Sequence, residues 1–257
     1  MKVITISSRE SGVGKSVVAV HLAHYLRDIG KSVLVIDLAY TDNTSRTLSE
    51  FAGSTTVPGL FDGKATSLRG QREVPRIELV RSNLGEDKAR WRRGDFGGSL
   101  ESASAMFREG VAAFAPHFDY CVVDTAPGLC VRARAALVTG DIVLIPVVPI
   151  AGAAEQVDRL FVELAVLNTQ CRTGAQPTLL VPNRFRSTRA DARVARAQLG
   201  KFFQHPTIDA PIAESEEIQN ALNKRMPVWA LGTRSSRRPA LQMRAALEAV
   251  GARIGAC

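Results

Sequence analysis

The sequence predicts a doubly wound α/β fold, with a mostly parallel sheet flanked by helices. Short runs rich in valine and isoleucine alternate along the chain with helix-like segments. The runs are apolar throughout, which indicates strands buried on both faces, as in parallel sheets. With 257 residues, of which 46% are hydrophobic and 23% charged, the chain can bury a sizeable core, and we expect residues 1–257 to form a single domain.

Each expected element follows from a local pattern. Strands are expected at six apolar runs: Val3 to Ile6, Val33 to Ile36, Ile77 to Val80, Tyr120 to Val123, Ile142 to Val147 and Thr178 to Val181. Helices are expected at Lys15 to Arg27, Ser99 to Phe114, Gly152 to Leu167, Ala190 to Phe203, Pro239 to Ile254 and, more briefly, Glu214 to Asn223. Gly30 follows the first helix, where a left-handed cap is favoured. The stretch from Ala39 to Pro75 is expected to hold loops and short helices.

A glycine-rich loop separates the first expected strand from the first expected helix. Its residues are Ser11, Gly12, Val13, Gly14, Lys15 and Ser16, followed by Val17. Glycines let backbone N–H groups point toward a phosphate, and the helix N-terminus adds its positive end. In this pattern Lys15 reaches the β- and γ-phosphates and Ser16 holds magnesium. We therefore predict that these seven residues bind ATP and Mg²⁺, although Arg9 replaces the first glycine of the general pattern.

Two acidic residues come at the ends of expected strands. Asp37 ends the second strand, and Asp124 follows the run that begins at Tyr120. An acid at the carboxyl end of such a strand can bind magnesium directly or through water. We predict Ser16, Asp37 and Asp124 as metal ligands, and Lys15, Asp37 and Asp124 as catalytic residues. The alternative for Asp124 is a helix-capping role.

These and later motifs resemble the ParA/MinD family of deviant Walker A ATPases over nearly the whole chain. The family's segments KGGVGKT, VLLIDLDPQ, DTPP, ADxVLIPVxP and GKPV resemble residues 10–16, 33–41, 124–127, 140–149 and 224–228. The resemblance implies a SIMIBI-like P-loop NTPase that forms a homodimer with ATP. It also implies that Asn183 lies beside the adenine, and we include Arg184 and Pro211 among the nucleotide-binding residues.

The chain departs from the family pattern at two positions. Glu10 stands where the family has a signature lysine that reaches the partner's nucleotide across the dimer, and Ala39 stands where it has a second aspartate. Phosphoryl transfer depends on positioning and charge stabilisation, so losing such groups slows it. We expect ATP binding to survive and hydrolysis to be slow, with Asp37 or Asp42 and a cation such as Arg9 as partial replacements.

The net charge of +8 is concentrated in two basic stretches. Residues 184–201 contain six basic residues and one acid, and residues 224–253 contain seven and one. Such stretches attract polyanions, the alternative being an ordinary solvated surface. The resemblance implies nonspecific DNA binding, with candidate contacts at Arg184, Arg186, Arg189, Arg193 and Arg196. Residues 208–214 lack the basic residues of the family's IPRN segment.

The leading functional hypothesis is segregation or positioning of DNA or another large cargo, by a cytoplasmic protein that associates with the nucleoid when it carries ATP. The resemblance also implies an adaptor or cargo protein that stimulates hydrolysis. The alternatives are a hydrolysis-impaired nucleotide-binding scaffold and an enzyme proper that uses the same loop. The four cysteines lack CxxC spacing and predict neither a zinc site nor a disulfide framework.

A further alternative is a MinD-like protein that binds membranes through an amphipathic C-terminal helix. Ala240, Met243, Leu247, Val250 and Ile254 recur at heptad-like spacing there. This face lacks bulky aromatic residues, so we expect it in the core or in a dimer contact rather than on a membrane. We find neither a run of 18 apolar residues nor a secretory signal, and membrane association is not expected.

Overall fold

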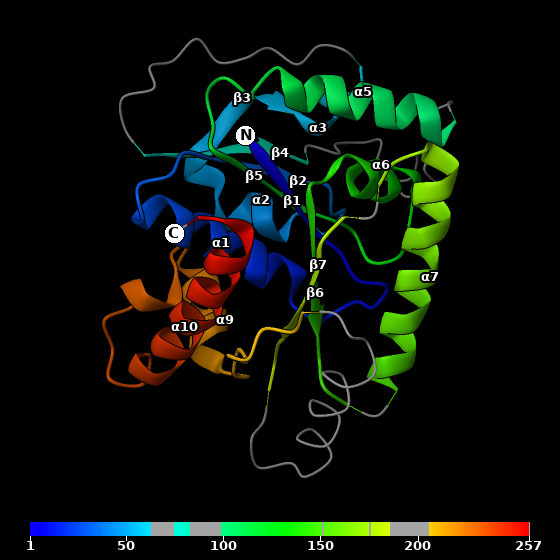
Figure 1. The fold of residues 1–257 in the computed structure, drawn as a ribbon. Coiled ribbons are helices and arrows are strands. Elements are labelled where there is room, and N and C mark those ends of the chain that lie inside the picture. The colour runs from blue at the N-terminus through cyan, green and yellow to red at the C-terminus, as the bar shows by residue number, and fades with distance from the viewer. Residues whose placement is uncertain (63–74, 83–98, 151, 175, 186–205, 257) are drawn as a thin grey trace.

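An all-parallel sheet runs through the centre of the protein in the computed structural model (Figure 1). The structure describes residues 1–62, 75–82, 99–150, 152–174, 176–185 and 206–256. Within these residues the sheet has seven strands in the order β3-β4-β2-β5-β1-β6-β7. Their bounds are β1 Lys2–Ile6, β2 Val33–Asp37, β3 Ala52–Thr56, β4 Ile77–Arg81, β5 Tyr120–Asp124, β6 Ile142–Val147 and β7 Thr178–Pro182. The predicted doubly wound α/β fold and its six apolar strands are confirmed.

The strand β3 is a correction to the loops and short helices expected between Ala39 and Pro75. It pairs only with β4 among the described strands, at the edge of the sheet, and its register shifts between Ala52 and Thr56. An edge strand can leave part of its surface to solvent, so its residues need not be apolar. The pattern of continuous apolar runs therefore missed it.

Helices cover both faces of the sheet. Their bounds are α1 Lys15–Asp28, α2 Asn43–Thr47, α3 Val57–Phe61, α5 Leu100–Ala112, α6 Val131–Thr139, α7 Ala153–Cys171, α9 Glu216–Asn223 and α10 Arg237–Ile254, with 3₁₀ turns η1 at Ser49–Phe51 and η3 at Val228–Ala230. The helix α6 was not predicted, because its short sequence carries Arg132 and Arg134 among the apolar residues. The helix expected at 190–203 lies outside the described residues.

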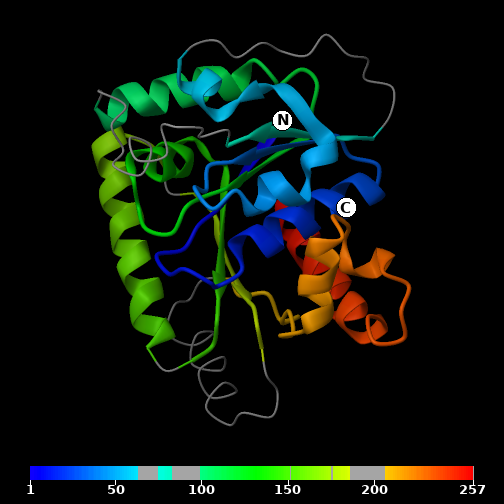
Figure 2. The ribbon, with the colours of Figure 1, turned by 180° about the vertical axis from the view of Figure 1, so that it is seen from behind.

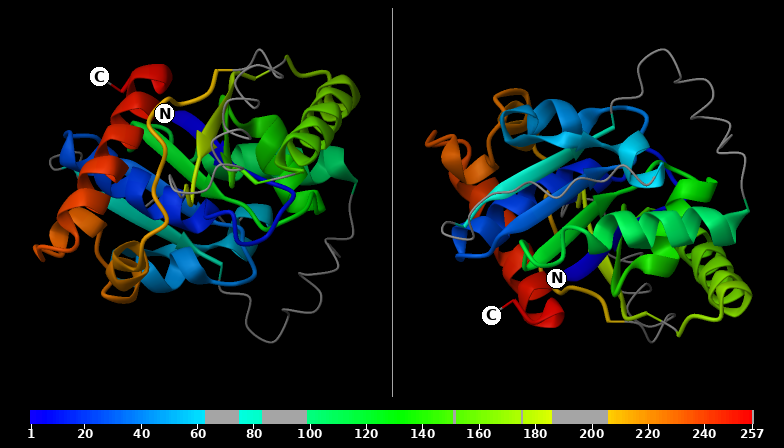
Figure 3. Two further views of the ribbon diagram at one scale, coloured as in Figure 1. Left: turned by 90° about the horizontal axis from the view of Figure 1, so that it is seen from below. Right: turned by 90° about the horizontal axis from the view of Figure 1, so that it is seen from above.

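The two faces of the sheet have separate cores. Ile4 and Val35 pack on one face in a cluster that includes residues of α1, α9 and α10. Leu34 and Val123 pack on the other face with residues of α3, α5 and α6, while α6 and α7 cover β6 and β7. Views from below and above show this division of the helices (Figure 3). From behind, α7 and α10 lie at opposite sides of the molecule (Figure 2).

Two sequence predictions about helices are confirmed, namely the left-handed cap after α1 and the burial of the apolar face of α10. Gly30, with φ of 86°, follows α1 in the left-handed conformation, and its neighbour Lys31 donates a 3.0 Å hydrogen bond to the carbonyl oxygen of Leu26. At the other end of the chain, the apolar face of α10 is buried, with Met243 and Val250 both 0% exposed. That face belongs to the core, as expected. Among the described residues, every helix is too short or too polar to cross a membrane.

Candidate nucleotide-binding site

The glycine loop joins β1 to α1 at the carboxyl edge of the sheet. Gly12 and Gly14 have φ of 74° and 92°, conformations that other residues adopt at a cost. Between them Val13 is buried, and α1 begins directly after Gly14. Lys15 is 7% exposed and donates a 2.7 Å hydrogen bond from Nζ to the backbone oxygen of Glu10. The loop thus curls around the lysine ammonium.

A segment distant in sequence, at the end of β7, hydrogen-bonds to the backbone of the phosphate loop. Asn183, just after β7, donates a 2.7 Å hydrogen bond from Nδ2 to the carbonyl oxygen of Val13. The contact is so close that a Cβ atom added to Gly14 would lie 2.0 Å from that nitrogen. Arg184 donates a 3.1 Å hydrogen bond to the carbonyl oxygen of Gly12, and its other terminal nitrogen lies 2.7 Å from Glu214 Oε1. Both residues therefore brace the loop in the structure.

The two predicted acids are neighbours on paired strands. Asp37 and Asp124 lie in register on β2 and β5, and each is 0% exposed. Asp37 accepts backbone hydrogen bonds of 3.0 Å from Ala39 and 2.7 Å from Ser45. Asp124 accepts a 2.8 Å hydrogen bond from the hydroxyl of Thr44. Since Thr44 and Ser45 belong to α2, both acids hold this short helix against the sheet.

Burial of like charges disturbs the protonation of this pair. Burial, followed by the neighbouring charge of Asp124, raises the pKa of Asp37 to about 7, against the opposing hydrogen bonds from Ser45 and Ala39. Burial also raises the pKa of Asp124, opposed by hydrogen bonds from Ser16 and Thr44 and by the charge of Lys15. Burial lowers the pKa of Lys15, opposed by Asp124 and Glu10. Additional positive charge at this point would favour ionisation of both acids.

The donor set fits a magnesium ion. One oxygen of Asp124, Oδ1, is buried and has no hydrogen-bond partner among the described residues. Such an oxygen is costly unless something binds it. Magnesium takes oxygen ligands, commonly one or two carboxylates together with substrate phosphates and waters. The hydroxyl of Ser16, which hydrogen-bonds to Asp124, and the buried carboxylates of Asp124 and its neighbour Asp37 therefore provide suitable oxygen atoms.

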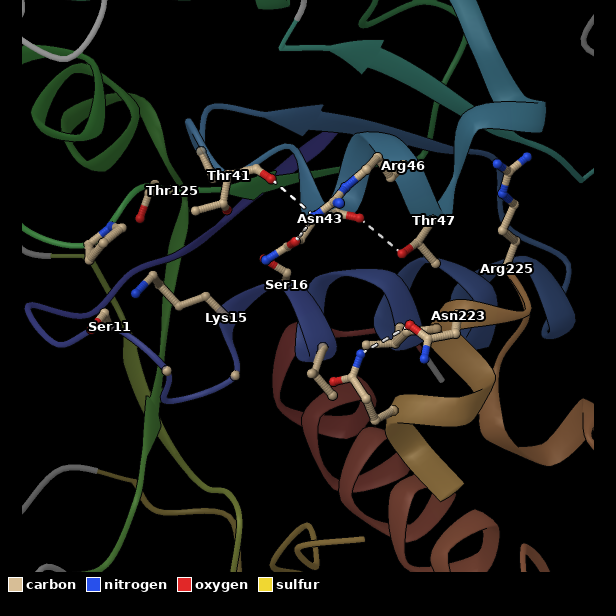
Figure 4. Close-up of a pocket in the computed structure, with 17 residues that line it drawn as sticks. Ser11, Lys15, Ser16, Thr41, Asn43, Arg46, Thr47, Thr125, Asn223 and Arg225 are labelled. Carbon is tan, nitrogen blue, oxygen red and sulfur yellow. Dashed lines mark hydrogen bonds between the residues drawn. The ribbon is translucent and has the colours of Figure 1, made fainter. Parts of the chain in front are cut away.

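A cavity of about 520 Å³ opens in front of the loop (Figure 4). The residues that line it are Ser11, Gly12, Gly14, Lys15, Ser16, Val17, Ala39, Thr41, Asn43, Arg46, Thr47, Thr125, Pro127, Gln219, Leu222, Asn223 and Arg225. Its charged lining residues, Lys15, Arg46 and Arg225, are all cationic. This wall suits a polyanionic ligand.

A second cavity, of about 710 Å³, shares Gly12 and Gly14 with the first. Asn183, Arg184 and Glu214 line it, together with the start of α9. Apart from the buried Val13, the predicted loop residues and Asn183 and Arg184 line these two adjoining cavities. Of the other predicted site residues, Asp37, Asp124 and Pro211 line neither cavity, and the two acids are fully buried.

Sequence reasoning missed the α2 and α9 residues of the first cavity. Arg46 and Gln219 carry no recognised motif, and only folding brings them to the loop. Arg225, just after α9, lies in the segment that resembles GKPV but was not predicted as a site residue. The position of Arg46 shortly after Asp37 was the available signal.

Two of the predicted cations, Arg9 and Arg184, form ion pairs with other side chains of the protein. Arg9 forms an ion pair with Glu163 of α7, and in the structure it lines neither of the two cavities. Arg184, predicted to bind both nucleotide and DNA, is held by Gly12 and Glu214. The other DNA candidates, Arg186, Arg189, Arg193 and Arg196, lie outside the described residues.

The fold and this site define a P-loop nucleotide-binding protein. A family model described as an AAA domain matches residues 1–175. The chain is 30% identical to Protein IncC of Escherichia coli over 260 residues, covering 95% of this chain and 67% of that protein. It is 26% identical to a ParA family protein of Chlamydia muridarum over 168 residues, covering 62% of this chain and 64% of that protein. The chain belongs to the ParA/MinD family of ATPases.

Solved structures share the fold. The apo form of McdA from Cyanothece superposes with a TM-score of 0.78 at 23% identity, covering 98% of this chain and all of that one (100%). MinD from Pyrococcus horikoshii in complex with Mg-ADP gives a TM-score of 0.70 at 17% identity, covering 97% and 95%. At these identities the likeness concerns the arrangement of strands and helices.

Proposed function

We propose that the protein is a ParA-like switch that binds Mg-ATP, dimerises face to face, and segregates or positions DNA or another large cargo. The observation that carries this proposal is the glycine loop around Lys15, braced by Asn183 and facing the buried pair Asp37 and Asp124. We also propose that the ATP-bound protein associates with the nucleoid and that an adaptor protein stimulates ATP turnover.

Each part of the site has a proposed task. The backbone of residues 11–17 cradles the phosphates, and Lys15 neutralises their charge. Ser16, Asp37 and Asp124 hold magnesium, which when bound supplies charge neutralisation to the phosphates. Asn183 and Arg184 line the space for the base. Pro211 stays a prediction.

Hydrolysis is proposed to be slow. Ala39 lines the cavity without a side-chain group able to orient water, and the side chain of Glu10 has the opposite charge to a lysine. Turnover well below the enzyme median of about 10 per second is expected. A turnover near that median would contradict slow hydrolysis, and binding with no turnover, with or without DNA, would favour the scaffold alternative.

The exposed surface between α9 and α10 supports nonspecific DNA binding. Lys224, Arg234, Arg237 and Arg238 are exposed there, and residues 224–238 contain no acid. Arg237 and Arg238 occupy the first turn of α10, where positive charge opposes the helix dipole. Helix stability does not favour these two arginines, whereas contact with DNA phosphates would.

The experiment compares R237A/R238A with R108A/R134A, a control pair of exposed arginines on α5 and α6. Binding to a random-sequence duplex is measured by fluorescence anisotropy with ATP and with ADP across a range of salt concentrations. We expect binding with ATP only, and R237A/R238A should reduce the slope of log K against log salt by about 1.8 for each protomer that contacts the DNA, at about 0.9 per phosphate contact.

The control pair should keep the wild-type salt slope and affinity. Size-exclusion chromatography of the same samples measures dimerisation. No DNA retention by wild-type protein in ATP at low salt would refute the DNA part of the proposal. A monomer in ATP would refute the dimer.

A further inference from the structure

Arg46 lines the first cavity, on the side opposite the phosphate loop (Figure 4). It belongs to α2, it is exposed, and its Nη2 donates hydrogen bonds of 2.5 Å to Asn43 Oδ1 and 3.4 Å to the carbonyl oxygen of Thr41. A guanidinium has five N–H donors, so these two bonds leave donors for a ligand. Arg46 is exposed and lines the first cavity, so a ligand in that cavity can reach its guanidinium.

The position of Arg46 is tied to the acids of the site. Ser45, its neighbour in α2, donates its backbone N–H to Asp37 at 2.7 Å. Thr44 donates its hydroxyl to Asp124 at 2.8 Å. Both acids are fully buried, so α2 is anchored to the rigid sheet at two points next to Arg46. Arg46 therefore lies on a short helix, α2, whose position relative to the phosphate loop is set by these two hydrogen bonds.

The cationic side chains near the loop fall into two groups, those paired with an acid and those that line the first cavity. Arg9 is paired with Glu163, and Arg184 with Glu214. Of the cations that line the first cavity, Lys15 lies within the loop, whereas Arg225 lies at the far end on the same side as Asn223 (Figure 4). Arg46 lies between them, with its guanidinium beside Asn43. It is thus the cation best placed to act together with Lys15.

We propose that Arg46 contacts the terminal phosphate of a bound nucleoside triphosphate from within the same chain. This inference rests on the proposed ATP binding and adds a residue that distinguishes triphosphate from diphosphate. A guanidinium can donate two parallel hydrogen bonds to phosphate oxygens, and such charge-assisted bonds are among the stronger ones. With Glu10 in the loop in place of a lysine, α2 would supply the second cation that the loop lacks.

The test uses three variants of the full chain, titrated with ATP and with ADP in the presence of MgCl₂ by isothermal calorimetry. Arg46→Gln retains an amide donor for Asn43 but loses the charge, and Arg46→Lys keeps the charge. Arg108→Gln removes an exposed arginine of α5 as the matched control. Thermal unfolding of each variant checks that α2 remains folded.

We expect Arg46→Gln to weaken ATP binding about tenfold or more, as for the loss of a hydrogen bond to a charged group, and to change ADP binding less than about twofold. Arg46→Lys should restore much of the preference for ATP, and Arg108→Gln should match wild type. An unchanged ratio of ATP to ADP affinity in Arg46→Gln overturns the inference, whether both affinities stay the same or both fall equally. Wild-type protein that binds neither nucleotide overturns the proposed function itself.

Discussion

The side-chain nitrogen Nδ2 of Asn183 lies 2.7 Å from the carbonyl oxygen of Val13, a residue 170 positions away in the sequence. This hydrogen bond closes the phosphate loop against the end of β7. Both partners are buried, since Val13 is 3% and Asn183 is 2% exposed. This part of the nucleotide site is therefore assembled from segments next to β1 and β7, the first and last strands among the described residues.

Loss of this bond should loosen the loop. In Asn183→Ala the carbonyl oxygen of Val13 would lose its partner, and an unsatisfied buried group costs about 1–3 kcal/mol. We expect a decrease of this size in the free energy of unfolding, together with weaker binding of both ATP and ADP. Denaturant unfolding and nucleotide titration measure the two effects. Wild-type affinity for both nucleotides in this variant would contradict the bracing role.

Gly14 should tolerate no side chain, because its Cβ would lie 2.0 Å from Asn183 Nδ2 and its φ is 92°. Gly30 offers the matched control, with φ of 86° and no atom within 4 Å of its added Cβ. Gly30→Ala should cost only backbone strain, about 1–2 kcal/mol, and leave nucleotide affinity unchanged. Gly14→Ala should cost more and weaken ATP binding at least about 100-fold, because the loop backbone must move. Equal effects of the two substitutions would show that the clash is unimportant.

Nucleotide binding with magnesium should depend on pH through Asp37. Burial and the charge of Asp124 raise the pKa of Asp37 to about 7, so below that pH a proton occupies the carboxylate that a cation requires. We expect the apparent affinity for Mg-ATP to be about tenfold weaker at pH 6 than at pH 8. Titration of ATP itself contributes as well, so the comparison is with Asp37→Asn, which should retain only the nucleotide's own pH dependence. Identical pH profiles for wild type and Asp37→Asn would exclude titration of Asp37 as a cause of the pH dependence.

Stability in mild acid should depend on His24. Burial, followed by the charge of Arg27, lowers the pKa of His24 from 6.5 to about 4, and both ring nitrogens lack hydrogen-bond partners among the described residues. Because the folded pKa is depressed, the unfolded chain binds the proton first. The neutral ring's contribution to stability is thus fully present above about pH 6.5 and is lost as the pH falls toward 4.

The variant that tests this effect is His24→Leu, with His117→Leu as the control at a half-buried loop position. Wild type should lose about 2 kcal/mol more stability than His24→Leu between pH 7 and pH 5. At pH 7 the variant should be more stable by about 1 kcal/mol, because two unsatisfied buried nitrogens are removed. Urea unfolding at each pH measures the difference. A constant gap between wild type and His24→Leu across this range would rule out titration of this ring.

The sequence predicted the six apolar strands correctly because strands buried on both faces must be apolar throughout, and this requirement is visible locally. It missed β3, whose edge position relaxes that requirement, and α6, in which Arg132 and Arg134 interrupt the apolar pattern. The loop of residues 11–17 and the two acids stay predictions of a binding site, which could be made because a phosphate and a metal impose residue types at fixed spacing along the chain.

Tertiary structure alone decided which distant residues complete the site. The register of β2 against β5 places Asp37 beside Asp124, and α2 then carries Arg46 to the cavity wall. The same folding pairs Arg9 with Glu163, so the proximity of Arg9 to the loop in sequence does not bring it into the cavity. The physical reason is that motifs record constraints between neighbours along the chain, whereas strand order and helix packing determine which charges meet in space.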